Sequence, residues 1–461
     1  MELAEIKDQK IMIVGLGKTG VAMTRFLSQA GAQVTVSDHK SPAELAEALE
    51  EVENLENVQF DLGGHTPKSM LGQDLIILSP GVSPELKLFQ YVRQHGVRTT
   101  SEIEFVSQFI NEPVIAIAGT NGKTTTGKTI ELMLTQAGKK VWFGGATNTP
   151  LVDYLLSGEK ADLVIVEIPS FQLEMVERFN PINIVFTNIS EAHLDRYKGF
   201  EEYVRTQRRV FQNVQVETTS ILNADENLVV DMARDPAVQR GRIFYFSKKA
   251  SLEPQIMNIG GCVNIGKEIR VRLGPEIEYY NVKSIKMRGR HSTENIMAAI
   301  CIARTHGATP EIIQNVMETF SGLPHRLEYV RRVGGVEFFN DSKATNVQAT
   351  RKALESFDEN VILIAGGKDS NQNFAKLEDL IRLKVKTLIL IGEAKERINR
   401  EIGDFTETFL IGTFEEAVLI AYQKSRIGDT VLLSPGSPSF DIFDSYEERG
   451  NYFKKLVNEF K

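Results

Sequence analysis

A segment rich in glycine and threonine, GTNGKTTT at residues 119–126, has the residue types that bind a phosphate group. It follows the apolar run VIAIA and precedes a stretch of helical pattern. In such a turn, backbone N–H groups at a helix N-terminus face a polyphosphate, a lysine reaches the outer phosphates and a hydroxyl ligates Mg²⁺. Lys123 and Thr124 would take the last two roles, although Ile117 stands where the strict motif has its first glycine. We predict a phosphate site here, with an ordinary glycine-rich turn as the alternative.

A second glycine motif, GLGKTG at residues 15–20, follows the apolar run at 11–14. Asp38 ends the next apolar run, about where a dinucleotide site has its ribose-binding acid. The segment SPGVSP at residues 79–84 follows a third run and would add a loop to the same site. Because such glycines also serve close packing of a strand against a helix, three interpretations stay open: an NAD-type site, a site for another nucleotide or phosphate ligand, and packing alone.

Two groups that can bind a metal ion follow apolar runs in the middle of the chain. Glu167 ends the run LVIVE, and His193 lies after the run INIVFTN. A carboxylate and a neutral imidazole at neighbouring strand ends can hold Mg²⁺ around a phosphate. The alternative is a helix-capping glutamate and a surface histidine, but the nearby phosphate motif favours the metal site.

Further polar clusters follow later in the chain. His291 and Asn295 stand four residues apart at a predicted helix start, where they would share one face. They would contact a base or a ribose, or simply form a polar helix terminus. Arg326 and the segment NDSKATN at residues 340–346 suit recognition of phosphate and carboxylate groups. A side-chain-stabilised turn is the alternative for that segment.

The elements that must position these residues are short apolar runs alternating with amphipathic helical stretches. This alternation predicts an α/β fold, with parallel sheets covered by helices on both faces and ligand sites at the carboxyl ends of the strands. Breaks between domains are predicted near residues 108–113 and 320–326. Between residues 250 and 290 the runs are short and rich in glycine, which indicates an antiparallel addition to the middle domain.

Composition excludes several classes of protein. The 461 residues include 53 basic and 61 acidic side chains, a net charge of −8, which argues mildly against a nucleic-acid binder. Cys262 and Cys301 are the two cysteines and form no CxxC pair, which excludes a disulfide scaffold and a thiolate zinc site. The first residues lack the apolar core of a signal peptide, and the longest apolar runs are too short to span a membrane. We expect a soluble, cytoplasmic protein.

Taken together, the motifs resemble those of the Mur ligases. They occur in the order and spacing of that family over nearly the whole chain: GTNGKTTT, EIPSFQL at 167–173, HLD at 193–195, LPHRLE at 323–328, NDSKATN and EERG at 447–450. Among Mur ligases, the pattern is most similar to the enzymes that add D-glutamate to UDP-N-acetylmuramoyl-L-alanine. The pairing of DSKATN with HRLE is much more specific than either glycine motif.

The resemblance implies three domains. Residues 1–110 would form a Rossmann-like domain that binds the uridine diphosphate of the substrate rather than NAD. Residues 111–322 would form a central P-loop ATPase-like domain with a mostly parallel sheet. Residues 323–461 would form a second Rossmann-like domain, which closes over ATP and binds the amino acid. We expect a monomer that binds neither nucleic acid nor a membrane.

The resemblance also assigns site residues. Lys123, Glu167 and His193 would be catalytic, and Thr124, Glu167 and His193 would bind Mg²⁺. The ATP-binding positions would be Gly119, Thr120, Asn121, Gly122, Lys123, Thr124, Thr125, His291, Asn295, Arg326 and Asp341. The positions that bind the other substrates would be Gly17, Lys18, Thr19, Asp38, Ser79, Pro80, Gly81, Asn148, Lys343, Thr345, Ser439 and Tyr446.

The implied chemistry is ATP-dependent amide formation through an acyl phosphate, in the synthesis of peptidoglycan precursors. The alanyl carboxylate would attack the γ-phosphate of ATP, and the amine of D-glutamate would then displace phosphate from the acyl carbon. Because two anions must meet in the first step, Mg²⁺ and cationic side chains must offset their charge.

Several positions depart from the family pattern. Gln207 stands where the family has a lysine that is carbamylated and helps to hold a second Mg²⁺, and Ser370 stands where a glutamate-binding lysine is expected. Pro169 and Ala146 replace a serine and a substrate-facing asparagine. The alternative hypothesis is therefore a nucleotide-binding homologue with impaired or altered chemistry. A sibling ligase for another amino acid is a further possibility, whereas an NAD-dependent oxidoreductase leaves GTNGKTTT and NDSKATN unexplained.

Overall fold

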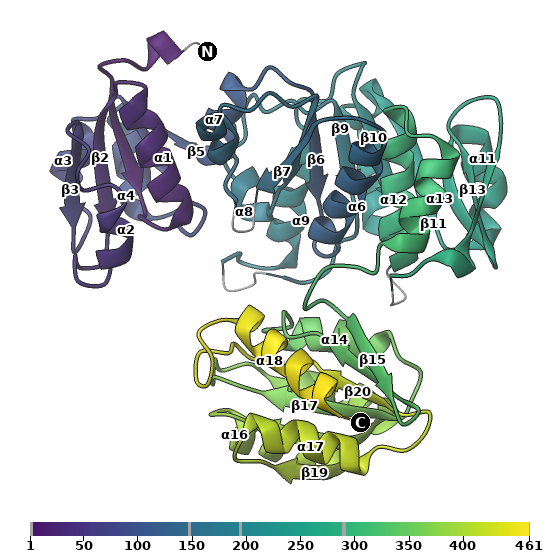
Figure 1. The fold of residues 1–461 in the computed structure, drawn as a ribbon. Coiled ribbons are helices and arrows are strands. Elements are labelled where there is room, and N and C mark those ends of the chain that lie inside the picture. The colour runs from purple at the N-terminus through teal and green to yellow at the C-terminus, as the bar shows by residue number, and fades with distance from the viewer. Residues whose placement is uncertain (1–2, 146–148, 193–195, 288–291, 461) are drawn as a thin grey trace. The chain divides into compact units, whose positions relative to one another are not determined.

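A computed structural model describes residues 3–145, 149–192, 196–287 and 292–460 of the chain. The described residues form three separate, mostly parallel sheets with helices around them (Figure 1). This confirms the predicted α/β class and its three sheet domains. By compactness the chain divides into two units, Met1–Lys283 with Glu294–Val316 and Ser284–Thr293 with Met317–Lys461. The domain limits predicted from the sequence stay predictions.

The N-terminal sheet is parallel throughout, in the order β3-β2-β1-β4-β5. Neighbouring side chains of its central strand point to opposite faces: Ile11 and Ile13 pack with α1, and Met12 and Val14 pack with α3 and α4. The apolar runs are continuous because both faces are buried. The strands are β1 (Lys10–Val14), β2 (Gln33–Asp38), β3 (Val58–Leu62), β4 (Leu75–Leu78) and β5 (Arg98–Ser101). The helices are α1 (Lys18–Gln29), α2 (Ala46–Glu50), α3 (Pro67–Leu71), α4 (Lys87–Gln94) and α5 (Glu102–Val106).

The central sheet has the order β14-β13-β12-β11-β10-β9-β6-β8-β7. It is parallel from β12 to β7, and β13 and β14 add to it in antiparallel fashion, which confirms the predicted antiparallel addition. The strands are β6 (Val114–Ala118), β7 (Val141–Gly145), β8 (Leu163–Glu167), β9 (Asn183–Phe186), β10 (Thr219–Asn223), β11 (Arg242–Ser247), β12 (Gly261–Ile265), β13 (Glu268–Arg272) and β14 (Glu278–Asn281). The helices are α6 (Lys123–Gln136), α7 (Val152–Ser157), α8 (Ser170–Leu173), α9 (Phe200–Arg208), α10 (Asn227–Ala233), α11 (Glu253–Ile259), α12 (Ser292–Thr305) and α13 (Pro310–Thr319).

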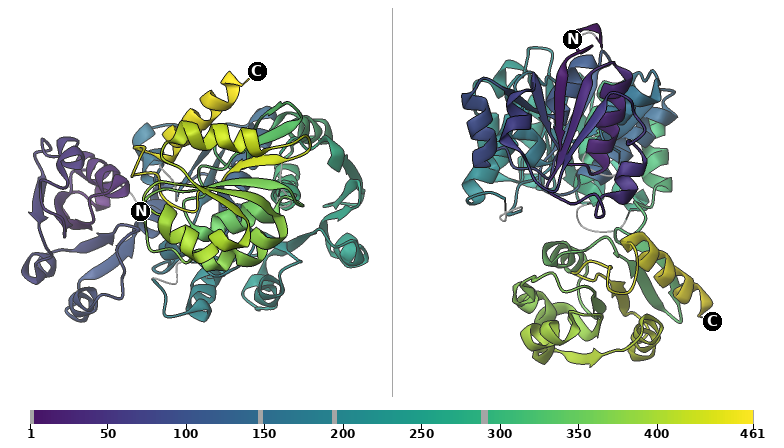
Figure 2. Two further views of the ribbon diagram at one scale, coloured as in Figure 1. Left: turned by 90° about the horizontal axis from the view of Figure 1, so that it is seen from below. Right: turned by 90° about the vertical axis from the view of Figure 1, so that its left-hand side faces the viewer.

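The C-terminal sheet has the order β15-β16-β20-β17-β18-β19, and only the edge strand β15 is antiparallel to its neighbour. Helices cover both of its faces, α14 to α16 on one and α17 with α18 on the other (Figure 2). The strands are β15 (Glu328–Val333), β16 (Val336–Asn340), β17 (Val361–Gly366), β18 (Val385–Ile391), β19 (Glu407–Leu410) and β20 (Thr430–Leu433). The helices are α14 (Val347–Glu355), α15 (Glu378–Lys384), α16 (Lys395–Ile402), α17 (Phe414–Lys424) and α18 (Tyr446–Glu459).

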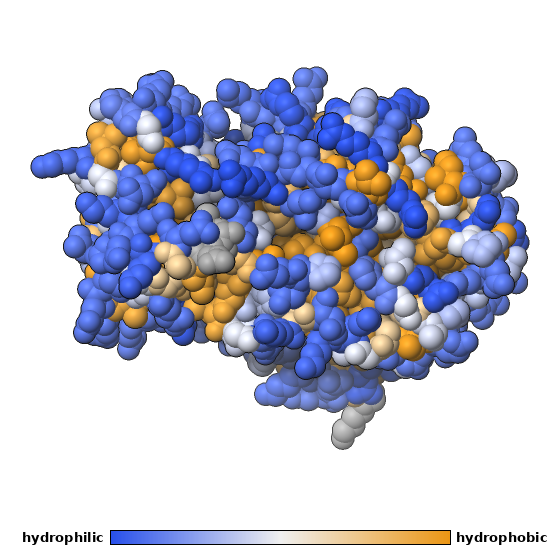
Figure 3. All heavy atoms as spheres, turned by 90° about the horizontal axis from the view of Figure 1, so that it is seen from above, coloured by the Kyte–Doolittle hydropathy of each residue, from blue (hydrophilic) through white to orange (hydrophobic). Residues whose placement is uncertain are grey.

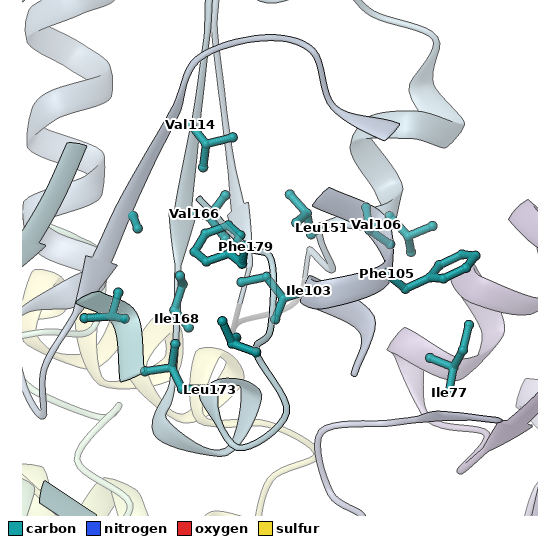
Figure 4. Packing of buried hydrophobic residues seen from close by; sticks show 14 of the residues in the cluster. Ile77, Ile103, Phe105, Val106, Val114, Leu151, Val166, Ile168, Leu173 and Phe179 are labelled. Atoms are coloured by element: carbon teal, nitrogen blue, oxygen red, sulfur yellow. The ribbon is translucent and has the colours of Figure 1, made fainter. Parts of the chain in front are cut away.

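One apolar core joins the N-terminal sheet to the central sheet. It includes Ile77 of β4, Ile103 and Phe105 of α5, and Val166 of β8, all of them buried (Figure 4). Removal of this continuous apolar surface from water stabilises the two sheets as one unit. This shared core explains why the first 283 residues form a single compact unit.

Three further features concern the surface, the length of the helices and the two cysteines. Hydrophilic side chains dominate the face drawn in Figure 3, where apolar side chains gather in separate patches. No helix within the described ranges has the length and apolar character that a membrane crossing requires. Cys262 of β12 and Cys301 of α12, distant in sequence, are both buried and free, with their Sγ atoms 3.1 Å apart.

Candidate active site

The phosphate motif forms the predicted strand–turn–helix, with the turn joining β6 to α6 (Figure 1). Two of its glycines adopt left-handed backbone angles, φ +113° at Gly119 and +83° at Gly122. A Cβ atom on Gly119 would lie 2.5 Å from Thr187 Oγ1, and one on Gly122 would lie 2.4 Å from Asn295 Oδ1. Only glycine therefore fits at either position, and the turn brings the chain directly into the N-terminus of α6, the end of a helix that favours an anion.

Hydrogen bonds from the neighbouring strand end and from α9 fix the shape of this turn. The Asn121 N–H donates to Asn188 Oδ1 at 3.0 Å, and Asn188 Nδ2 donates to the Asn121 carbonyl at 2.9 Å. The hydroxyls of Thr120 and Tyr203 are 2.8 Å apart. Lys123 Nζ donates to the carbonyls of Gly119 and Thr120 at 2.9 and 3.0 Å, which holds its positive charge over the turn.

Gln207 supports the same turn from α9. Its side chain is buried, with Oε1 3.4 Å from the Gly119 N–H and Nε2 donating to the Tyr203 hydroxyl at 2.9 Å. The neutral amide thus occupies the position where the family pattern has a carbamylated lysine. Its observed contacts are structural and connect α9 to the phosphate turn.

Glu167 offers a ligand for a metal ion. It ends β8, paired in register with Ile117, the residue before the last of β6, and only 6% of it is exposed. Its Oε2 atom accepts no hydrogen bond from the described residues, and a buried carboxylate oxygen without a partner is costly unless a cation binds it.

The donor set fits Mg²⁺. No three His, Cys, Asp or Glu side chains gather in the part of the chain that the structure describes. The buried carboxylate of Glu167 beside the phosphate turn suits Mg²⁺, which typically binds through one or two carboxylates, waters and substrate phosphates. Thr124, the second residue of α6, would add a hydroxyl. His193 lies outside the described residues, so its assignment as a ligand stays a prediction.

Asn295 of α12 packs against the phosphate turn, where its Oδ1 accepts a hydrogen bond from Thr126 Oγ1 at 3.3 Å. The structure thereby brings together residues that are 169 positions apart. A direct contact of Asn295 with a nucleotide stays a prediction. His291, predicted to lie beside it, is outside the described residues.

In the N-terminal domain, Asp38 holds the glycine loop. Its Oδ2 accepts from the Leu16 N–H at 2.7 Å, and its Oδ1 accepts from the Lys40 N–H at 2.9 Å. Ser79 Oγ donates to the Gly15 carbonyl at 2.7 Å, so the loop after β4 lies against the glycine loop. One backbone amide on each carboxylate oxygen thus fixes the position of the Asp38 side chain beside the glycine loop.

The remaining residues predicted for this site surround the same loops. Gly17 is the N-cap of α1, which begins with Lys18 and Thr19, and Pro80 and Gly81 follow Ser79. Asn148 lies outside the described residues. Ligand contacts by all of these residues stay predictions.

The C-terminal domain places Asp341 directly after β16, where it is buried. Its carboxylate accepts hydrogen bonds from the Leu327 N–H at 3.1 Å and from Ser434 Oγ at 2.8 Å. Burial raises the pKa of Asp341 to about 7, more than these hydrogen bonds and the charge of Arg326 lower it.

Lys343 and Tyr446 meet in the same domain, with the Lys343 Nζ 3.8 Å from the centre of the Tyr446 ring. Burial raises the pKa of Tyr446 to about 12. Thr345 is half-buried and Ser439 is buried. The loops that contain these two residues are joined by a hydrogen bond, in which the Gly436 N–H donates to the Ala344 carbonyl at 2.9 Å. Ser370 is exposed.

Sequence reasoning missed several supporting residues, Tyr203, Glu174, Arg196 and Arg449 among them. Arg449 is buried, which lowers its pKa to about 10, and its Nε donates to Ser342 Oγ at 2.9 Å. Its Nη1 also donates to the Ser437 carbonyl at 3.2 Å, so one guanidinium connects the segment at 340–346 to the loop at 434–441. The only sequence signal was its place in the EERG motif.

Comparisons with known proteins agree with this arrangement. Residues 9–101 match the family described as Mur ligase MurD-like, N-terminal domain; residues 117–303 match the Mur ligase middle domain; and residues 325–436 match the Mur ligase glutamate ligase domain. The UDP-N-acetylmuramoylalanine–D-glutamate ligase of Bdellovibrio bacteriovorus is 64% identical over 459 residues, covering 100% of this chain and 99% of that protein. The ligase of the same name from Geotalea daltonii is 42% identical and covers 98% of each chain.

Solved structures show the same fold at low identity. A pseudomurein peptide ligase type C from Methanothermus fervidus superposes with a TM-score of 0.59 at 20% identity, covering 98% of this chain and 100% of that one. The UDP-N-acetylmuramate-alanine ligase of Thermotoga maritima gives 0.57 at 18% identity, covering 98% of both chains.

The fold combines a phosphate-turn domain with two further domains built on mostly parallel sheets, and the family matches over all three identify it as a ligase fold. The full-length similarity places the chain within that class: it belongs to the Mur ligase family. This confirms the resemblance drawn from the motifs.

Proposed function

We propose that the protein adds D-glutamate to UDP-N-acetylmuramoyl-L-alanine at the expense of ATP, with Mg²⁺, in the synthesis of peptidoglycan precursors. The similarity to ligases of that name over the whole chain supports the substrates. The observation that carries the chemistry is the phosphate turn with Lys123 over it, next to the strand end that bears Glu167, whose buried Oε2 accepts no hydrogen bond from the described residues.

The proposed reaction has two steps. The alanyl carboxylate attacks the γ-phosphorus of ATP, which forms an acyl phosphate and releases ADP. The amine of D-glutamate then attacks the acyl carbon, an amide bond forms, phosphate leaves and the amine loses a proton. The net products are the dipeptide nucleotide, ADP and phosphate.

The chain's own groups offset the charge of the first step. Lys123 and the N–H groups at the start of α6 bind the phosphates, and the Asn121–Asn188 hydrogen bonds keep those groups in place before ATP binds. When bound, Mg²⁺ neutralises phosphate charge, and Glu167, Thr124 and His193 would hold it. Asn295, His291, Arg326 and Asp341 would contact the nucleotide.

Two further regions would bind the other substrates. The glycine loop, Asp38 and the loop at 79–81 would receive the uridine diphosphate, with Asn148 facing the rest of that substrate. Lys343, Thr345, Ser439 and Tyr446 would surround the incoming amino acid. The Lys343 ammonium, close to the Tyr446 ring, can pair with a carboxylate of glutamate.

The test measures ADP release with ATP and Mg²⁺ in the presence of UDP-N-acetylmuramoyl-L-alanine, with and without D-glutamate, and identifies the product by mass spectrometry. We expect release that depends on both substrates. Lys123→Ala should lower the rate by about 10²–10³, the usual effect of removing one group that stabilises transition-state charge. Lys128→Ala is the matched control, because Lys128 lies on the same helix and pairs with Glu131.

ATP binding without ADP release would contradict the ligase activity and favour the impaired homologue. Release that requires another amino acid in place of D-glutamate would contradict only the specificity. If Lys123→Ala and Lys128→Ala lowered the rate of ADP release equally, the phosphate-binding role assigned to Lys123 would be contradicted.

A further inference from the structure

Arg196 connects two loops that belong to different predicted sites. It lies three residues after His193, and its guanidinium reaches the loop after β4 in the N-terminal domain. There Nη1 donates to the Pro80 carbonyl at 3.1 Å and Nη2 donates to the Val82 carbonyl at 3.0 Å. Both acceptors belong to residues 79–84, which also contact the glycine loop through Ser79.

Glu174, which follows α8, fixes the orientation of this guanidinium. Its two carboxylate oxygens accept from Arg196 Nε and Nη2, each at 2.7 Å, and the Phe171 ring lies 5.4 Å from the guanidinium carbon. Only 15% of the Arg196 side chain and 12% of the Glu174 side chain are exposed. A paired carboxylate compensates for removing the arginine from water, while the planar fork leaves other N–H groups for the two carbonyls.

The next residue along the chain is anchored as well. The Tyr197 hydroxyl donates to Ser170 Oγ at 2.9 Å, so Tyr197 contacts α8 while Arg196 contacts Glu174, the residue that follows this helix. Hydrogen bonds and an ion pair, rather than a covalent bond, connect these loops. The hydrogen bonds of one guanidinium therefore join the loop after β4 in the N-terminal domain to Glu174, which follows α8 in the central domain.

We propose that Arg196 is a positioning residue that couples occupancy of the uridine nucleotide loop at 79–84 to the placement of Arg196, Tyr197 and the chain that follows them into α9. This inference rests on the proposed function for the identity of the bound nucleotide. Glu174 acts through Arg196 and holds it in the one orientation that serves both loops. Lysine cannot replace this arrangement, because an ammonium cannot bind a carboxylate in the two-pronged manner and also reach two carbonyls in the same plane.

Three variants test the coupling: Arg196→Lys, Glu174→Gln and the control Arg205→Lys. Arg205 is in the same region of the chain but its side chain is 77% exposed. We expect Arg196→Lys to raise KM for the uridine substrate about tenfold, which corresponds to about 1.4 kcal/mol, and to leave KM for ATP unchanged. Glu174→Gln should act in the same direction more weakly, and Arg205→Lys should behave as the parent protein.

A second measurement needs binding only. Hydrogen exchange of the whole protein is followed by mass spectrometry with and without UDP. We expect UDP to slow exchange in peptides that cover residues 79–84 and also in those that cover 196–208, and the second effect should be lost in Arg196→Lys.

The outcomes separate this inference from the proposed function. A parent protein that makes no product refutes the proposed ligase activity, while the exchange experiment still decides the coupling. The coupling is refuted if UDP protects residues 79–84 alone in the parent protein, or if Arg196→Lys raises KM for both nucleotides equally and lowers the unfolding temperature. The latter result marks a general structural role.

Discussion

At the scale of single residues, the phosphate turn depends on neighbours that lie outside its own motif. Gln207 reaches the Gly119 N–H and the Tyr203 hydroxyl, and Tyr203 in turn contacts Thr120. A charged group at this buried position would have to be paired or neutralised. The glutamine amide instead connects a donor and an acceptor without adding charge, so this departure from the family pattern is compatible with an intact turn.

Gln207→Ala tests this support. The substitution removes the Gly119 and Tyr203 contacts of a buried amide, which should destabilise the unit that contains it by about 1–3 kcal/mol and weaken ATP binding. Thermal unfolding and calorimetric titration with ATP measure the two effects. Gln212→Ala, at an exposed position shortly after α9, is the control. Equal behaviour of the two variants would show that the turn does not depend on Gln207.

At the scale of elements, two separate reasons require a glycine at the start of α6: the left-handed backbone angle and the lack of space for a side chain. A glycine after the other end of the same helix shares only the first reason, so the two effects can be measured separately. Gly122 at its N-terminus and Gly138 just after its C-terminus have nearly the same backbone angle, φ +83° and +82°. A Cβ atom on Gly122 would collide with Asn295, whereas one on Gly138 would meet nothing within 4 Å.

Gly122→Ala and Gly138→Ala should therefore share the same backbone strain, about 1–2 kcal/mol. Only Gly122→Ala should also displace Asn295 and lower the affinity for ATP, by roughly tenfold or more, an added cost of at least about 1.4 kcal/mol. Calorimetric titration of the two variants with ATP gives the comparison. If both variants bind ATP equally well, the contact between the turn and α12 has no role in nucleotide binding.

A second feature at this scale is the raised pKa of Glu102, the first residue of helix α5. The side chain is buried, where Oε1 accepts from the Val152 N–H at 3.1 Å and Oε2 accepts from Gln172 Nε2 at 3.2 Å. Burial raises the pKa of Glu102 from 4.5 to about 7 against the opposing effect of these hydrogen bonds. The folded chain therefore keeps a proton that the unfolded chain releases.

The sign of the pH dependence follows from this difference. Between pH 4.5 and about 7 the folded state binds more protons at Glu102, so the free energy of unfolding falls as the pH rises through this window. Glu102→Gln cannot ionise and should show a shallower fall than the parent protein. Denaturant unfolding at several pH values between 4 and 8 measures both slopes, and identical slopes would contradict the raised pKa.

At the scale of the whole molecule, the three sheets group into two compact units, because the N-terminal and central sheets share an apolar core. Ile103 lies in that core and Leu363 lies in the core of the C-terminal sheet, and both are fully buried. The two side chains offer a matched test of independent unfolding.

Ile103→Ala and Leu363→Ala should each cost about 2–5 kcal/mol, the range for truncating a buried aliphatic side chain. We expect Ile103→Ala to lower the midpoint only of the transition that contains the first 283 residues, and Leu363→Ala to lower only that of the C-terminal unit. Differential scanning calorimetry distinguishes the transitions. A common shift of all transitions would mean that the chain unfolds as one cooperative body.

Much of the fold and part of the site could be predicted because the responsible signals are local. Continuous apolar runs between amphipathic stretches indicated parallel sheets, and the glycines and lysine of residues 119–126 indicated a turn at a helix N-terminus. The family resemblance, confirmed over the full chain, added the three domains and the assignment of residues to ligands. Those assignments stay predictions, and His193, His291 and Asn148 lie outside the described residues.

The amino-acid sequence by itself thus determined the class of fold, the phosphate turn and the family. Only the tertiary structure decided which distant residues support the site: Gln207 on Gly119, Asn295 on the turn, Arg196 on the loop after β4, and Arg449 between two C-terminal loops. The physical reason is that a strand, a turn or a helix start is encoded by neighbouring residues. Contacts between side chains far apart in sequence depend on how complete sheets and helices pack, which no local pattern of residues specifies.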